Sequence, residues 1–144
     1  MKLGGFGYLR FMVPLFSPSV HSYYWPLVVS LSGSSIILAS LTAIRQLDMK
    51  RVIAYSSIAH MNIAVLGMFS NNLQALSGSL AIMISHGFVS SAMFLLVGVL
   101  YDRYHSRLIY HYSGLAQTMP IFATLLLLAS LGNIGFPLTY NYIG

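Results

Sequence analysis

The chain has 144 residues, of which only seven are Lys or Arg and two are Asp or Glu. Charged residues make up 6% of the sequence, whereas a soluble domain carries roughly a quarter, and hydrophobic residues make up 57%. Side chains of this kind cannot cover a soluble globular protein, and the same balance excludes a disordered chain. The net charge of +5 reflects a shortage of acids, and no Lys/Arg stripe forms a nucleic-acid-binding face. The composition therefore predicts a polytopic membrane protein.

Five apolar segments are separated by polar linkers. A helix that crosses a membrane needs about 20 mostly apolar residues, and lipid does not tolerate open sheet edges, so each long segment is expected to be a helix. The first segment, residues 3–16, is too short to cross alone and is interrupted by Arg10 and Pro14. The longer segments are residues 23–44, 51–69, 75–100 and 115–144. The expected fold is an all-α transmembrane bundle of about four to five helices.

The linkers alternate between uncharged and charged sequences. Residues 17–22 and 70–74 carry no formal charge, whereas residues 45–51 and 101–113 hold all five Lys and Arg residues of the linkers. Alternate linkers of a bundle lie on the same side of the membrane. Because Lys and Arg are enriched in loops that stay inside, we expect both charged linkers on the cytoplasmic or matrix side.

Two histidines lie in the middle of consecutive apolar segments. His60 follows Ser56 and Ser57 by four and three residues, and His86 precedes Ser90 by four, so each imidazole shares a helix face with hydroxyls. A lone buried histidine is commonly a packing residue. Two of them, each with hydroxyls at helical spacing, favour a shared polar path. Because histidine titrates near neutral pH, that path could relay protons, with the serines organising water.

Three further features carry charged or helix-breaking groups. Lys2 opens the first apolar stretch, either as an interfacial lysine or as a lysine within a longer helix. Lys50 lies in the charged linker 45–51, as part of a solvated turn or in the head of the next helix. Gly135 and Pro137 predict that the last helix is broken, because proline removes a backbone donor and glycine permits unwinding. Membrane proteins tolerate such a break where the freed groups line a cavity or meet protein.

Other chemistry has little support in the sequence. The chain has no cysteine, so no disulfide, thiolate metal site or cysteine nucleophile is expected. No acidic side chain accompanies the histidines inside the segments, which disfavours both a metal site and a hydrolytic Ser/His site. No GxGxxG motif or phosphate-binding lysine loop is present, so we expect no nicotinamide, flavin, iron–sulfur or quinone site in this chain.

Strings along the whole chain, in order, resemble one family. They are KLGGFG at 2–7, RQLDMKRVIAYSSIAHM at 45–61, MISHG at 83–87, YDRYHSR at 101–107, and Gly132-Asn133 followed by Pro137 and NYIG at 141–144. They resemble the NADH dehydrogenase subunit 4 family, the antiporter-like membrane subunits of respiratory complex I. The amino-acid sequence is most similar to plant or algal mitochondrial forms.

The resemblance implies that residues 1–144 are one segment of an antiporter-like module built from inverted repeats. Lys2 matches the family's central lysine, His60 and His86 match its helix-borne histidines, and Lys50 matches a lysine of the loop-to-helix string. The family's key carboxylate directly follows the string that ends at Gly144. The resemblance therefore implies a chain incomplete at both ends, as a partial sequence or as the product of a split gene.

The function implied is that of a membrane subunit of proton-pumping NADH:ubiquinone oxidoreductase in the mitochondrial inner membrane, with the charged linkers in the matrix. NADH, FMN, iron–sulfur clusters and ubiquinone would then act in partner subunits. The expected partners are the other membrane subunits, lipids and the remainder of the same subunit. Two alternatives stay open: a subunit of a multi-subunit cation/proton antiporter, and a helical scaffold that conducts nothing.

Overall fold

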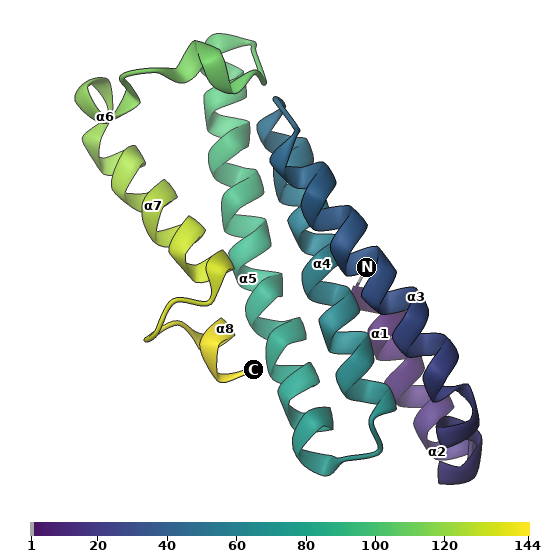
Figure 1. The fold of residues 1–144 in the computed structure, drawn as a ribbon. Helices are drawn as coiled ribbons and strands as arrows, with labels where there is room; N and C mark the ends of the chain where they lie inside the picture. The colour runs from purple at the N-terminus through teal and green to yellow at the C-terminus, as the bar shows by residue number, and fades with distance from the viewer. Residues whose placement is uncertain (1) are drawn as a thin grey trace.

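The computed structural model describes residues 2–144, which are helical and contain no strand beyond one isolated bridge. Three long helices lie side by side and alternate in direction: α3 (Pro18–Ile44), α4 (Met49–Phe69) and α5 (Leu73–Tyr104). Helix α4 lies between the other two and packs against both (Figure 1). The prediction of an all-α helical bundle is confirmed.

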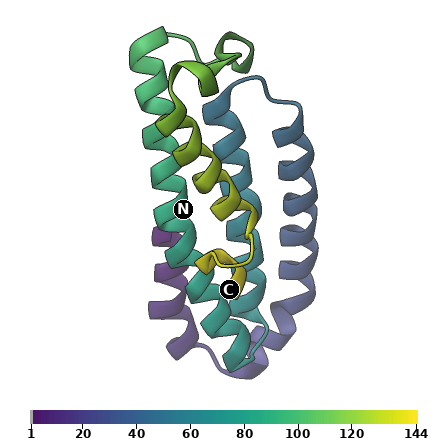
Figure 2. The same cartoon turned by 90° about the vertical axis from the view of Figure 1, so that its left-hand side faces the viewer.

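Shorter elements flank the three long helices. The N-terminal segment consists of α1 (Lys2–Gly7), a π-helical turn η1 (Tyr8–Met12) and α2 (Val13–Leu15). The C-terminal segment consists of a 3-10 helix η2 (Ile109–Tyr112), α6 (Leu115–Thr118), α7 (Pro120–Ile134) and α8 (Tyr140–Ile143). Both segments reach α5: α1 packs on it from one side, and α7 and α8 lie against another part of it (Figure 2).

Within the described part of the chain, three helices are long and apolar enough to cross a membrane, namely Ser19–Ile44, Met49–Phe69 and Leu73–Tyr104. At 1.5 Å per residue α4 is about 31 Å long, which matches a hydrocarbon core of about 30 Å, whereas α5 at about 48 Å exceeds it. Helix α7 is also apolar but has only 15 residues. The four to five expected helices are thus three long spans, α7, and the short N-terminal segment.

The long helices extend further than the hydropathy pattern predicted. Helix α3 begins at Pro18, so most of the expected linker 17–22 is helical. Proline is favoured in the first helical turn, where its missing N–H is not needed, and Ser17 before it is extended. Helix α5 likewise runs to Tyr104, four residues past its expected end. Polar residues at helix ends therefore made the linkers look longer than they are.

The N-terminal segment is helical through both of its expected interruptions. Pro14 cannot donate a backbone hydrogen bond, and its ring would clash with the carbonyl four residues earlier in a regular α-helix. The π-turn directly before it changes the spacing, and Val13 N–H bonds Tyr8 C=O, five residues back. Arg10 lies in this turn and is exposed. The local widening of the helix therefore accommodates the proline.

The last apolar segment is divided. Helix α7 begins at Pro120, later than expected, and ends where Gly135 adopts a left-handed conformation with φ of 81°. Leu138 also has a positive φ, of 82°, and the helix resumes only as α8. Pro137 therefore lies between the two helices, and the predicted break in the last helix is present.

The two charged linkers meet at one end of the bundle. Asp48 and Leu108 form an antiparallel bridge, flanked by hydrogen bonds from Met49 N–H to Arg107 C=O at 3.2 Å and from Ile109 N–H to Leu47 C=O at 3.1 Å. The nearby Tyr112 hydroxyl donates to the Ser106 carbonyl, and burial, with a contribution from Tyr104, raises the pKa of Tyr112. The charge-bearing linkers thus share one end, and the uncharged linkers lie at the other.

The interior contains almost as many polar as apolar side chains. Among the described residues, eight hydrophobic side chains are buried, and the buried polar ones are His21, Ser32, Ser57, Ser79, Ser85, His86 and Ser90. Most large hydrophobic side chains are exposed. Small hydroxyl residues let membrane helices approach closely, and their exposed apolar faces suit lipid or neighbouring protein. This inverted distribution agrees with a membrane bundle.

Candidate functional site

The two mid-membrane histidines face each other across the α4–α5 contact. The ring centroids of His60 and His86 are 5.1 Å apart, with their planes inclined by 41°. His86 is fully buried, and among the described residues neither of its ring nitrogens has a hydrogen-bond partner. His60 is half-buried. The histidines expected in consecutive spans are therefore direct neighbours.

Lys2 reaches the same place from α1. Its Nζ donates a hydrogen bond of 3.0 Å to Oγ of Ser90, which lies one turn beyond His86 on α5. Lys2 is only half-buried, since α1 packs chiefly on α5. Of the three ionisable side chains expected to be buried, only His86 is fully so. Lys2, His86 and His60 nevertheless form a polar row across α1, α5 and α4.

The predicted supporting serines differ in their contacts. Ser90 links the row to Lys2. The hydroxyls of Ser56 and Ser57 both donate to the Ile53 carbonyl of their own helix, each at 2.9 Å. Ser56 also accepts a bond of 3.4 Å from Nδ2 of Asn133 on α7. The structure therefore places Ser56 at the contact with the broken helix, while an organising role for water stays a prediction.

Two asparagines anchor the break, and the sequence analysis gave neither a role. Asn141 Oδ1 accepts a hydrogen bond of 2.5 Å from Ser85 Oγ, and its Nδ2 donates to the Gly132 carbonyl at 3.1 Å. Asn133 holds the other side of the break through Ser56. Amide side chains within apolar helices are uncommon, and that could have indicated them. Together they tie α7 and α8 to the helices that carry the histidines.

A cavity of about 250 Å³ lies beside the break and contacts the polar row. Its lining comes from α4, α5 and both sides of the break: His60, Ile63, Ile82, Ile134, Gly135, Asn141 and Tyr142. Of these residues, His60, Asn141 and Tyr142 have polar side chains. The volume is ample for several waters, since each occupies about 30 Å³ in the liquid. The broken helix therefore opens polar space next to His60.

Lys50 lies away from this row. It is in the first turn of α4, ten residues before His60, so the two are separated by about 15 Å along the helix. Its Nζ is 5.2 Å from the centre of the Tyr101 ring, and the Arg107 guanidinium is 4.7 Å from the same ring. The structure thus groups Lys50 with the charged end, and its part in a proton path stays a prediction.

The comparisons with known proteins agree with this arrangement. The family model described as NADH:quinone oxidoreductase/Mrp antiporter, TM, matches residues 1–144. Relatives named NADH-ubiquinone oxidoreductase chain 4 are 51% identical in Marchantia polymorpha, and 50% identical in both Chondrus crispus and Triticum aestivum. Each match covers 100% of this chain, and the chain spans 29% of the length of each relative. The resemblance inferred from the sequence strings is confirmed, and the chain belongs to the family of NADH:quinone oxidoreductase and Mrp antiporter membrane proteins.

Proposed function

We propose that the chain acts within a membrane subunit of proton-pumping NADH:ubiquinone oxidoreductase, where Lys2, His86 and His60 pass protons along the row. The observation that carries the proposal is the row itself: Lys2 bonds Ser90, and His86 contacts His60. Relatives that carry the name NADH-ubiquinone oxidoreductase chain 4 across the full chain support the choice of complex.

The row is suited to holding one proton at a time. Two positive charges about 5 Å apart repel by roughly 3 kcal/mol at an effective dielectric constant near 20. Two protons on the His60 and His86 pair therefore oppose each other, so the pair favours a single proton. His86 can then take up a proton from one neighbour and release it to the other. The cavity beside His60 gives the row a polar outlet at the broken helix.

Electron transfer belongs to other subunits in this proposal. NADH, FMN, iron–sulfur clusters and ubiquinone would bind there, and their charge changes would act on the row through electrostatics or conformation. The complex would lie in the mitochondrial inner membrane with lipids and the remaining membrane subunits around this chain. The charged linkers 45–51 and 101–113 would face the matrix, as expected from their Lys and Arg content.

Replacement of His86 by Ala in the assembled complex tests the row. The ratio of protons transferred to NADH oxidised should fall, while assembly on a native gel stays intact. Ser91→Ala on α5 is a matched control, because Ser91 is exposed and bonds only the Phe88 carbonyl. An unchanged ratio for His86→Ala would contradict the proposal. Loss of assembly with retained proton transfer would favour a scaffold.

A cation/proton antiporter is the second candidate, because the matched family includes Mrp antiporters. The same row could exchange a proton against a cation without any redox partner. Purification of the chain from its native membrane separates the two functions. Association with flavin and iron–sulfur subunits supports the oxidoreductase, and association with antiporter subunits alone supports the transporter.

A further inference from the structure

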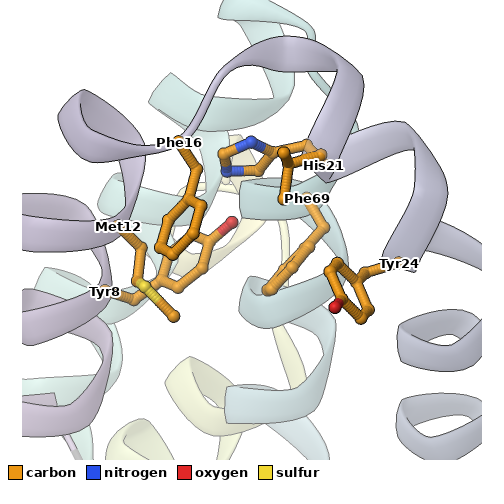
Figure 3. Close-up of a pocket in the computed structure, with 7 residues that line it drawn as sticks. Tyr8, Met12, Phe16, His21, Tyr24 and Phe69 are labelled. Carbon is orange, nitrogen blue, oxygen red and sulfur yellow. The ribbon is translucent and has the colours of Figure 1, made fainter.

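A second cluster of polar and aromatic side chains lies at the end of the bundle opposite the charged linkers. It joins Tyr8 of η1, His21 in the first turns of α3, and Phe69 at the end of α4 (Figure 3). Tyr8 stacks on Phe69 with ring centroids 4.5 Å apart, and the His21 ring is 6.1 Å from Tyr8 and 5.9 Å from Phe69. His21 is only 7% exposed. The sequence pattern predicted that this histidine lies in the uncharged linker 17–22.

The three rings border a small inner cavity of about 80 Å³. The Tyr8 hydroxyl is buried and has no hydrogen-bond partner among the described residues, and Figure 3 shows it directed toward His21. Buried tyrosine hydroxyls usually find a partner. Ligand pockets measure about 300–1,000 Å³, so this cavity is too small for a cofactor but can hold two or three waters. The cavity is therefore large enough to admit water beside the Tyr8 hydroxyl, but not a larger ligand.

A second, outer cavity of about 210 Å³ adjoins the same histidine. His21 and Phe16 line both cavities, and the outer one also contacts Asn71 and Asn72 in the uncharged linker between α4 and α5. Nδ1 of His21 lies 3.3 Å from the Ser17 carbonyl, which can only accept, so Nδ1 donates. In the neutral ring the other nitrogen is then an acceptor. His21 therefore borders both cavities, and the second one reaches the asparagines at the bundle end.

Tyr8 lies on the same N-terminal helical segment as Lys2, the first member of the polar row. It lies six residues beyond Lys2, about 9 Å along the helix. Between them, Gly5 is covered by the flexible side chains of Met68 and Met83. Methionine repacks easily, and apolar constrictions in membranes open and close by hydration. The stretch between Lys2 and Tyr8 is thus short, and the side chains that border it can move.

We propose that Tyr8 and His21 form a hydratable outlet that carries protons between Lys2 and the uncharged end of the bundle. The outlet rests on the proposed function of the row. A proton released from the Lys2 ammonium passes through water to the Tyr8 hydroxyl, which accepts it on oxygen and donates its own to the next water. His21 then binds that proton on its free ring nitrogen and gives up a proton to the outer cavity. No group is consumed.

The first experiment compares proton transfer in the assembled complex in vesicles. Tyr8→Phe and His21→Gln should each lower the ratio of protons transferred to NADH oxidised by as much as Lys2→Met does. Tyr23→Phe is the matched control, since Tyr23 lies on the same helix as His21, is 79% exposed and lines neither cavity, and it should leave the ratio unchanged. Native gels check that every variant assembles.

A second readout detects water directly and does not depend on pumping. The chain has no cysteine, so a single introduced thiol can be followed on it. Tyr8→Cys should react with a membrane-impermeant maleimide added from the side of the uncharged linkers, at least tenfold faster than Leu9→Cys. Leu9 is at the same depth and, like Tyr8, packs on the core formed by Ala64, Met68 and Met83, but unlike Tyr8 it does not line the inner cavity. Equal, slow labelling of the two thiols would overturn the outlet, even where Tyr8→Phe fails to assemble.

The outcomes separate the outlet from the proposed function. If Lys2→Met lowers the ratio while Tyr8→Phe and His21→Gln keep it, the outlet is wrong and the row stands. If Lys2→Met and His86→Ala also keep the ratio, the proposed function fails. A loss in all four variants, with fast labelling of Tyr8→Cys, supports both.

Discussion

The charged end of the bundle and its polar interior use cations in opposite ways. At the charged end, Lys50 and Arg107 share the Tyr101 ring, and Arg51 pairs with Asp48 at 3.2 Å. In the interior, Lys2 has one hydroxyl partner and His86 has no hydrogen-bonded partner among the described residues. Cations that are paired with aromatic or acidic groups are held in place and stay charged. Cations with few partners can give up their charge, and that distinction separates anchoring residues from candidate proton carriers.

Replacement of lysine by arginine at positions 2 and 50 is expected to give the largest difference in proton transfer between the interior and the charged end. Arginine keeps its charge at any physiological pH, so it can replace a fixed cation but cannot release a proton. Lys2→Arg should reduce proton transfer to the level of Lys2→Met. Lys50→Arg should retain it, because a guanidinium can also lie over the Tyr101 ring. Proton-to-electron ratios in vesicles measure both, and a loss in Lys50→Arg would bring Lys50 into the path.

Replacement of His86 by Leu should separate stability from function. A buried polar group without a partner costs about 1–3 kcal/mol, and an apolar side chain of similar size removes that cost. We expect His86→Leu to raise the thermal unfolding temperature of the subunit in detergent while the proton-to-electron ratio falls. A parallel loss of stability would instead show that the imidazole is well hydrogen-bonded, and would weaken the contrast with the charged end.

The sequence predicted the members of the polar row but not all of its contacts. Gaps between charges located the three long helices, and helical spacing placed His60 and His86 each on a face with hydroxyls, which favoured a shared path. The bond between Lys2 and Ser90 joins residues 88 positions apart, which no local pattern encodes. The same holds for Ser85 and Asn141, 56 positions apart.

Helix ends were harder to place than helix centres. Hydropathy treated the polar residues 17–22 as a linker, whereas Pro18 at the first turn starts α3 and buries His21. Arg10 and Pro14 looked like interruptions, but a single π-turn carries the helix past them. Both errors arise because backbone geometry at a proline, rather than the polarity of nearby side chains, decides where these helices start and continue.

Loss of the hydrogen bonds that anchor the broken helix should have an effect of intermediate size on the local stability of α8. Asn141→Leu removes the bonds to Ser85 and to the Gly132 carbonyl, about 1 kcal/mol each, so α8 should open about 2 kcal/mol more easily. Hydrogen exchange at the amides of α8, in the solubilised complex, measures this as a roughly thirtyfold faster rate. Asn62→Leu is the control, because among the described residues Asn62 bonds only the Ile58 carbonyl of its own helix. Equal rates in the two variants would mean that the amide does not hold the break.

The ion pair between Arg51 and Asp48 at the charged end should contribute least to stability. Side chains of Arg51 and Asp48 are 69% and 29% exposed, and exposed pairs are worth about 0.2–1 kcal/mol because water and salt screen them. Asp48→Asn should therefore lower the thermal unfolding temperature only slightly more than Asp102→Asn, whose exposed carboxylate forms no ion pair among the described residues. The difference should vanish in 1 M salt, where screening acts within about 3 Å. A large effect that persists in high salt would place the stability of the charged end in its ion pair, and not in the backbone bonds that join linkers 45–51 and 101–113.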